Sequence, residues 1–144
     1  MRKHGFTLIE LLVVIAIITI LAGMVVGGAQ QARKRGAITK TKAQIATLET
    51  AISMYEADIG NHPGSGNSSL VSALTEDSGD ADWSGPYIKI RKDELNDKGE
   101  YLDAWGNSFV YVNPGAHNEY SYDLYSSGPD GKGDGTEKDD IQNW

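Results

Sequence analysis

The chain has 144 residues, no cysteine and a formal net charge of −7. This length leaves room for one membrane segment and one small soluble domain, since domains commonly have about 100–150 residues, and the missing cysteines exclude disulfide and thiolate chemistry. Residues 29–144 carry a net charge of −8, because Arg2, Lys3 and Glu10 together contribute +1. That charge argues against nucleic acid or anionic lipid as the partner of the soluble domain.

The N-terminus is basic and then strongly apolar. Met1-Arg2-Lys3-His4 precede Gly5-Phe6-Thr7-Leu8-Ile9-Glu10, and from Leu11 to Gly28 the only side chain with a strong polar group is Thr19. This stretch is about long enough to cross a bilayer core as a helix. A secretory signal has a shorter apolar region, about 7–15 residues, that ends at a cleavage site. The pattern therefore predicts a membrane segment.

Glu10 stands at the start of the apolar stretch. An ionised side chain at the bilayer centre costs roughly 2.5–3.5 kcal/mol on insertion scales. We therefore expect Glu10 to have a cationic partner; the alternative is a glutamate that lies at the membrane surface.

The apolar segment continues into an amphipathic helix. Apolar side chains recur at three- and four-residue spacing on one face: Ile38, Ile45, Leu48, Ile52, Tyr55 and Ile59. Gly60 and Pro63 end the pattern. The sequence predicts one helix from Phe6 to Ile59, with residues 6–29 in the membrane or filament core and residues 30–60 in the soluble domain. Gly23 and Gly27 form a Gly-x-x-x-Gly pattern, which is typical of close packing between membrane helices. The alternatives are a place where the helix unwinds on assembly, or only the high frequency of glycine in membrane helices.

Residues 61–144 are expected to complete the soluble domain. Residues 61–85 are typical of a loop with a short helix from Leu70 to Leu74, and Asn67-Ser68-Ser69 fits a glycosylation sequon. Strands are predicted at Ser108–Val112 and Tyr120–Tyr125, with a further strand or edge at Pro86–Ile90. The predicted fold class is α+β, with the long helix packed on a small antiparallel sheet.

The C-terminal segment is acidic and rich in glycine. Five acidic residues lie between Asp130 and Asp140, a pattern that suits calcium, which takes six to eight oxygen ligands. The segment is no EF-hand, because a pattern begun at Asp130 has Lys132 at its third position and Ile141 where the bidentate glutamate belongs. A solvated acidic tail is the alternative. Ile141 and Trp144 favour a tail that folds back onto the domain.

The sequence offers no arrangement of catalytic residues. His4, His62 and His117 are isolated, and no pair of them has the spacing of metal ligands. We predict that the chain is not an enzyme.

The Gly5–Glu10 motif, its basic leader and the following helix resemble the class III signal of type IV pilins and secretion pseudopilins. The resemblance implies that a prepilin peptidase cuts between Gly5 and Phe6 and methylates the new N-terminal Phe6. It also implies that Glu10 pairs with the N-terminal amine of a neighbouring subunit, a role that fits the tolerance of a buried carboxylate opposite an ammonium.

The C-terminal segment resembles that of the major pseudopilin of the type II secretion system. The shared elements are Ser126–Gly131, Asp139–Trp144 and Asp103-Ala104-Trp105-Gly106-Asn107. The resemblance implies a calcium-stapled loop with side-chain ligands Asp130, Asp139 and Asp140, backbone ligands Ser127 and Lys132, and Asp134 as an alternative ligand. Lys138 before the aspartate pair and Ala104 in place of proline depart from the family pattern.

The resemblance implies a structural subunit that polymerises into a helical pseudopilus and drives protein secretion across the outer membrane. The positive-inside rule is close to a tie here, so the orientation rests on the family: a single-pass precursor in the inner membrane with its soluble domain in the periplasm. Expected partners are identical subunits, minor pseudopilins, the inner-membrane secretion platform and the prepilin peptidase, but no nucleic acid. The alternatives are a type IV pilin or competence pilin-like subunit and, in another class, a monomeric membrane-anchored calcium-binding module.

Overall fold

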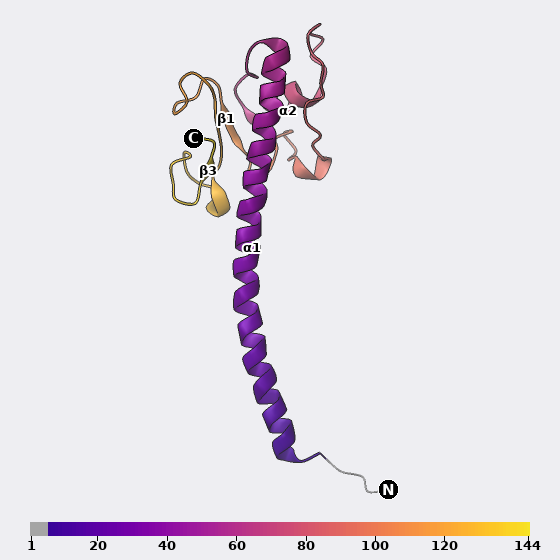
Figure 1. Cartoon of the computed structure of the whole chain (residues 1–144), viewed down its shortest axis with the longest axis vertical. Helices are drawn as coiled ribbons and strands as arrows, with labels where there is room; N and C mark the ends of the chain where they lie inside the picture. The colour runs from indigo at the N-terminus through magenta and orange to yellow at the C-terminus, as the bar shows by residue number, and fades with distance from the viewer. Residues whose placement is uncertain (1–5) are drawn as a thin grey trace. The chain divides into compact units, whose positions relative to one another are not determined.

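The computed structural model describes residues 6–144, so the leader and Gly5 lie outside the described residues. The helices are α1 (Leu8–Ile59) and α2 (Asn67–Thr75), and the strands are β1 (Val110–Val112), β2 (Asp123–Ser126) and β3 (Ile141–Gln142) (Figure 1). Two short 3₁₀ helices, Lys92–Glu94 and Gly128–Asp130, complete the elements. The chain forms two compact units, one ending at Gly36 and the other comprising Ala37–Trp144. Each is described separately.

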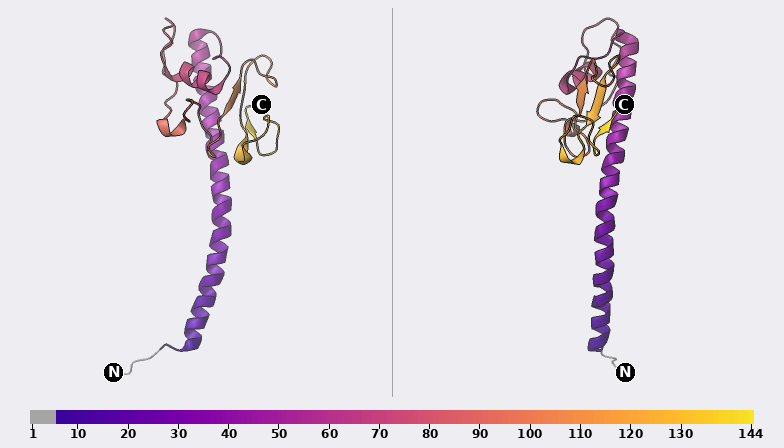
Figure 2. Two further views of the ribbon diagram at one scale, coloured as in Figure 1. Left: turned by 180° about the vertical axis from the view of Figure 1, so that it is seen from behind. Right: turned by 90° about the vertical axis from the view of Figure 1, so that its left-hand side faces the viewer.

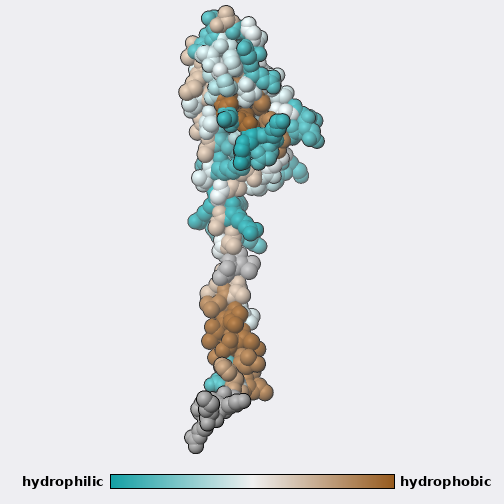
Figure 3. Space-filling view, turned by 90° about the vertical axis from the view of Figure 1, so that its right-hand side faces the viewer, coloured by the Kyte–Doolittle hydropathy of each residue, from teal (hydrophilic) through white to brown (hydrophobic). Residues whose placement is uncertain are grey.

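The N-terminal unit consists of the apolar half of α1. Its apolar side chains are exposed within the chain, for example Leu8 at 83%, Ile9 at 69% and Ile20 at 61% (Figure 3). By length and composition α1 can cross a membrane, and its most apolar window is not buried inside the protein. A continuous apolar surface of this size marks an interaction with lipid or with other proteins. These exposed residues belong to the segment, residues 6–29, that the sequence predicts to lie in the membrane or the filament core.

The second unit is built on the C-terminal half of α1. Ile45, Leu48 and Ile52 are buried at the predicted helical spacing, and Ile38 and Tyr55 pack against the same core. The helix ends as predicted at Gly60. Its amide donates to the carbonyl oxygen of Glu56 at 2.8 Å, and its positive φ of 83° turns the chain out of the helix. The amphipathic pattern thus gave the buried face correctly.

A three-stranded antiparallel sheet packs against this face of α1. The strand order is β1-β2-β3, with Tyr111 opposite Leu124 and Ser126 opposite Ile141. Figure 2 shows the sheet beside the C-terminal half of α1. Leu124, Tyr111 and Ile141 belong to one buried cluster with the residues of α1 and with Leu74 of α2. This arrangement confirms the predicted α+β class.

The predicted strand at Pro86–Ile90 is wrong, because this extended segment does not belong to the sheet. Pro86 has no amide proton for a ladder, and the amide of Tyr87 donates to the carbonyl oxygen of Leu74 in α2 at 2.8 Å. The Tyr87 ring makes edge contacts with Tyr55 and Trp83. The ring contacts and the Tyr87–Leu74 bond therefore hold this segment, and pairing with another strand does not.

The sequon residue Asn67 has a structural role. It is buried at 8% exposure, and its side-chain amide donates to the carbonyl oxygens of Tyr101 and Phe109 at 3.0 and 2.7 Å. Its Oδ1 accepts from the Tyr101 amide at 2.7 Å. Glycosylation would replace one of the two donated protons and would place a sugar at this buried amide, so Asn67 is a tie between α2 and the sheet region and no glycan acceptor.

Candidate assembly helix and metal centre

The first turn of α1 is closed by a reciprocal capping box. The hydroxyl of Thr7 accepts from the Glu10 amide at 3.3 Å, and the Thr7 amide and hydroxyl donate to Glu10 Oε2 at 2.8 and 2.9 Å. Such a pair satisfies amides that otherwise lack partners at a helix N-terminus. The helix therefore begins at Leu8, two residues after the predicted Phe6.

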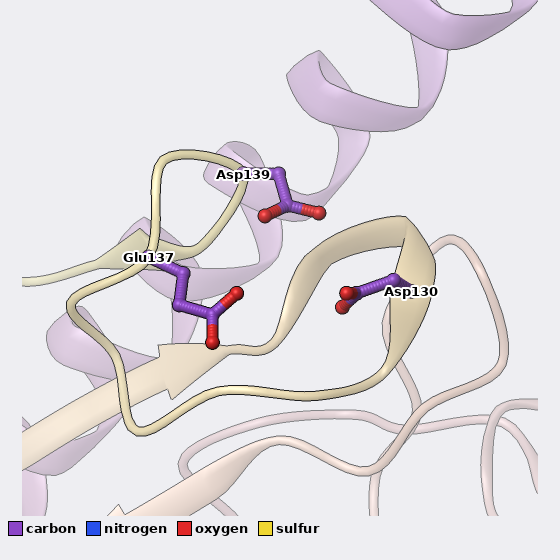
Figure 4. A group of neighbouring side chains, drawn as sticks. All are labelled: Asp130, Glu137 and Asp139. Atoms are coloured by element: carbon purple, nitrogen blue, oxygen red, sulfur yellow. The ribbon is translucent and has the colours of Figure 1, made fainter.

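The C-terminal loop gathers three carboxylates. Asp130 lies on the 3₁₀ helix Gly128–Asp130, whereas Glu137 and Asp139 lie in the turn before β3. One carboxylate oxygen from each lies within 4.8 Å of the others, and Figure 4 shows the three side chains pointing toward one another. Three negative charges at this separation repel one another unless a cation lies between them. Carboxylate oxygens are the ligands that calcium prefers.

Two of these residues, Asp130 and Asp139, belong to the predicted ligand set, and Glu137 does not. The resemblance to the family pointed to the aspartate pair Asp139-Asp140 and left Glu137 without a role. The signal that could have found it was its place among the five acidic residues between Asp130 and Asp140.

Asp140 lies inside the same loop, at 8% exposure. Its Oδ2 accepts from the amides of Gly135 at 3.1 Å and Glu137 at 2.9 Å. Its Oδ1 is buried and has no hydrogen-bond partner within residues 6–144. A buried carboxylate oxygen without a partner raises the free energy of the folded state, and a cation bound in this loop would supply a partner. The role of Asp140 as a direct ligand stays a prediction.

The remaining predicted ligands are placed as follows. Asp134 is exposed, and its Oδ1 accepts from the hydroxyl and the amide of Thr136, bonds that lower the pKa of Asp134. The Lys132 amide donates to Asp130 Oδ1 at 2.9 Å, and Ser127 is buried before the 3₁₀ helix. Asp134 does not belong to the three-carboxylate group. The roles of Ser127 and Lys132 stay predictions.

A turn from Asp103 to Asn107 holds the beginning of the loop. Asp103 Oδ1 accepts from the amides of Trp105 and Asn107 at 2.8 and 2.9 Å, and its Oδ2 accepts from the Ser126 hydroxyl at 2.6 Å. The side-chain amide of Asn107 donates to the Gly128 carbonyl at 2.8 Å. Because these bonds end at residues 126 and 128, the turn fixes the backbone that leads to Asp130.

Glycine is required where the two sides of the loop meet. Gly128 has a φ of 64°, and a Cβ there would overlap the carbonyl oxygen of Asp139. This close approach brings the 3₁₀ helix next to the Asp139 backbone.

The end of the chain folds back onto the domain, as predicted. Ile141 is buried in the core, and the Trp144 ring stacks on His117 with centroids 4.4 Å apart. Trp144 also meets the ring of Tyr125 edge-on at 5.8 Å. The loop is thus closed at both ends, by the Asp103–Asn107 turn and by β3 with Trp144.

The described histidines have structural neighbours. His62 Nε2 lies 3.2 Å from a carboxylate oxygen of Glu56, and its ring packs edge-on against Tyr122. His117 stacks on Trp144. His4 lies outside the described residues. That the chain is not an enzyme stays a prediction from the sequence.

Comparison with known proteins identifies the family. The family described as "Type II secretion system (T2SS), protein G" matches residues 28–144, and the "Prokaryotic N-terminal methylation motif" matches residues 1–26. The type II secretion system core protein G of Escherichia coli (strain K12) is 40% identical and is aligned over 99% of this chain and 92% of that protein. The core protein G of Pseudomonas aeruginosa is 35% identical over 99% of this chain and 96% of that protein. The chain therefore belongs to the type II secretion system protein G family.

A solved structure was also matched. It is the crystal structure of the major pseudopilin from the type 2 secretion system of enterohaemorrhagic Escherichia coli, with a TM-score of 0.48 and 24% identity over 83% of this chain and 92% of that chain.

Proposed function

We propose that this chain is the structural subunit of a helical pseudopilus that drives protein secretion across the outer membrane. The observation that carries the proposal is the family match over residues 28–144 combined with the methylation motif over residues 1–26. The exposed apolar side chains of α1 support it, because identical helices can cover one another in a filament.

The precursor would be a single-pass protein of the inner membrane with its soluble domain in the periplasm. The prepilin peptidase would cut between Gly5 and Phe6 and methylate Phe6. The filament would grow from copies of this chain, together with minor pseudopilins and the inner-membrane secretion platform. None of these steps uses a catalytic group of this chain.

Glu10 would supply the charge that selects a neighbouring subunit. Both bonds from Thr7 end on Oε2 of Glu10. Within residues 6–144 no hydrogen bond to Oε1 is seen, so this oxygen is available to the N-terminal amine of another subunit. The pair would neutralise a carboxylate that is costly alone in an apolar surrounding.

Calcium is the proposed structural cofactor of the C-terminal loop. Asp130, Glu137 and Asp139 would hold the ion with their carboxylates, and Asp140 would order the loop amides. When bound, calcium supplies positive charge that cancels the repulsion among the three carboxylates. The loop residues would then tie the Gly128–Asp130 helix to the turn before β3.

Processing and secretion together test the proposed function. In its own bacterium, the mature chain should begin at N-methylated Phe6 by mass spectrometry, and deletion of the gene should leave secreted proteins in the periplasm. Reintroduction of the gene should restore secretion. A mature chain that begins at Met1, or secretion that is unchanged in the deletion strain, would refute the proposal.

A further inference from the structure

Three consecutive cations follow the apolar segment of α1. Arg33, Lys34 and Arg35 are all exposed, and we call them the basic collar. Successive residues of an α-helix are rotated by about 100°, so three in a row surround more than half of the helix. A collar of this kind meets charges on several sides of the helix.

The collar lies at the depth of lipid phosphates if α1 crosses a bilayer. Leu11–Gly28 is roughly 27 Å long at about 1.5 Å per residue, and Arg33 lies about 7.5 Å beyond Gly28. The hydrocarbon core is about 30 Å thick and the bilayer with its headgroups about 40–45 Å, which leaves each headgroup layer roughly 5–7.5 Å. Helical side chains lean toward the N-terminus, so those of Arg33 and Lys34 reach back toward this layer.

The sequence around the collar has no acidic residue. From Leu11 to Leu48 the sequence contains five cations and no acidic residue. In the part of the chain that the structure describes, the ion pairs His62–Glu56, Arg91–Asp93 and Arg91–Glu94 do not involve Arg33 or Lys34.

The two parts of the chain carry net charges of opposite sign. Met1–Gly36 carries +4, since it has five cations and Glu10, and Ala37–Trp144 therefore carries −11 of the total of −7. The charge of Ala37–Trp144 argues against an anionic lipid partner for that part of the chain. The collar, which the net charge of residues 29–144 had included, is the part that such lipids attract.

We propose that the basic collar binds the phosphate headgroups of anionic phospholipids and so sets the depth of α1 in the bilayer before assembly. This inference rests on the proposed membrane-spanning precursor. A subunit that enters the filament would have to release these phosphates when α1 leaves the bilayer.

Native mass spectrometry of the full-length chain in nanodiscs tests the collar. The discs contain equal amounts of phosphatidylcholine and phosphatidylglycerol, and the lipids that stay bound to the released chain are counted. The test variant is Arg33→Gln/Lys34→Gln. The matched control is Lys40→Gln/Lys42→Gln, which removes the same charge from α1 beyond Gly36.

The wild-type chain and the control should retain phosphatidylglycerol in preference to phosphatidylcholine. The test variant should lose this preference by roughly 30-fold, from about 1 kcal/mol for each cation near an anionic surface. No preference in the wild type, or an equal loss in both variants, would overturn the inference.

Three further outcomes also decide the matter. A chain that does not enter the discs would refute the membrane placement and the inference with it, whereas a chain that enters without lipid preference refutes only the inference. Displacement of phosphatidylglycerol by inorganic phosphate at constant ionic strength would assign the collar to free phosphate. Dimers in pure phosphatidylcholine discs that disappear in the test variant would assign it to a second copy of the chain. Either assignment overturns the lipid proposal.

Discussion

The side-chain amide of Asn107 donates to the carbonyl oxygen of Gly128 at 2.8 Å, across 21 positions of sequence. This bond links the turn after Asp103 to the 3₁₀ helix that carries Asp130. The three-carboxylate group therefore depends on a residue that is not itself acidic.

Replacement of Asn107 by alanine should weaken calcium binding as well as the fold. Loss of the bond leaves the Gly128 carbonyl with the longer bond from the Gly131 amide, at 3.4 Å, and costs about 1 kcal/mol, the net contribution of a typical hydrogen bond. In detergent, the full-length Asn107→Ala chain should melt at a lower temperature, and calcium should raise that temperature less than in the wild type.

The control for this variant is Asn96→Ala. Asn96 is also held by several hydrogen bonds, to Lys98, Glu100 and Ser108, but outside the C-terminal loop. Its loss should lower stability and leave the calcium effect intact. An equal calcium effect in Asn107→Ala and the wild type would contradict the coupling.

Calcium should stabilise the full-length chain, and Glu137 should matter for this effect. Binding to the folded state alone adds about 2.7 kcal/mol at a calcium concentration 100 times the dissociation constant. Circular dichroism melts with calcium and then with chelator measure the shift. Glu137→Gln should reduce it, because one of the three converging carboxylates is lost.

Asp134→Asn is the matched control, since Asp134 is exposed and bonded to Thr136 outside this group. The calcium shift should be unchanged in it. A chelator that has no effect on the wild-type melt would refute the calcium site, and a normal shift in Glu137→Gln would remove Glu137 from the ligand set.

Asp123 should make the domain sensitive to acid. It is 3% exposed, and burial would raise its pKa, but the backbone amides of His117, Asn118 and Ala116 donate to its carboxylate and lower the pKa on balance. The pKa of Asp123 in the folded state therefore lies below its pKa in the unfolded chain, which is about 3.9. The ionised carboxylate stabilises the fold at any pH above the unfolded-state pKa, and this stability is lost as the pH falls through the folded-state pKa.

Urea unfolding between about pH 5 and pH 3 measures this effect. The free energy of unfolding should fall with decreasing pH in the wild type and less steeply in Asp123→Asn, which cannot ionise. The exposed Asp97→Asn should keep the wild-type slope. An Asp123→Asn slope as steep as that of the wild type would contradict the assignment.

Glu10→Ala should prevent entry into filaments without unfolding the soluble domain. The change removes the proposed counter-charge and also the acceptor for the Thr7 amide in the capping box, and the net contribution of one such hydrogen bond is about 1 kcal/mol. Immunoblots of sheared filaments measure incorporation, and circular dichroism melts measure the domain. Normal filaments would disprove the pairing.

Glu10→Gln separates the two roles of Glu10. Glutamine also suits the third helical position of a capping box but carries no charge. If charge pairing selects the subunit, Glu10→Gln should be excluded like Glu10→Ala. Full incorporation of Glu10→Gln would show that the cap is sufficient.

Much of the fold could be predicted because its signals are local. The apolar run, the spacing of Ile45, Leu48 and Ile52, and the ending at Gly60 all depend on residues close in sequence. The strands β1 and β2 were predicted from short apolar and aromatic runs. By contrast, β3 has only two residues and pairs with β2 across the whole acidic loop, so no local pattern marked it.

The sequence by itself determined an apolar helix with one acid at its start, an amphipathic continuation and an acidic, glycine-rich end, since helical periodicity and composition can be read residue by residue. Only the tertiary structure decided which carboxylates meet. Asp130 and Asp139 converge with Glu137, while Asp140 turns to the amides of Gly135 and Glu137. The reason is physical: the Asn107–Gly128 bond, the close approach at Gly128 and the packing of Ile141 set the path of the loop, and all three are contacts between residues far apart in sequence.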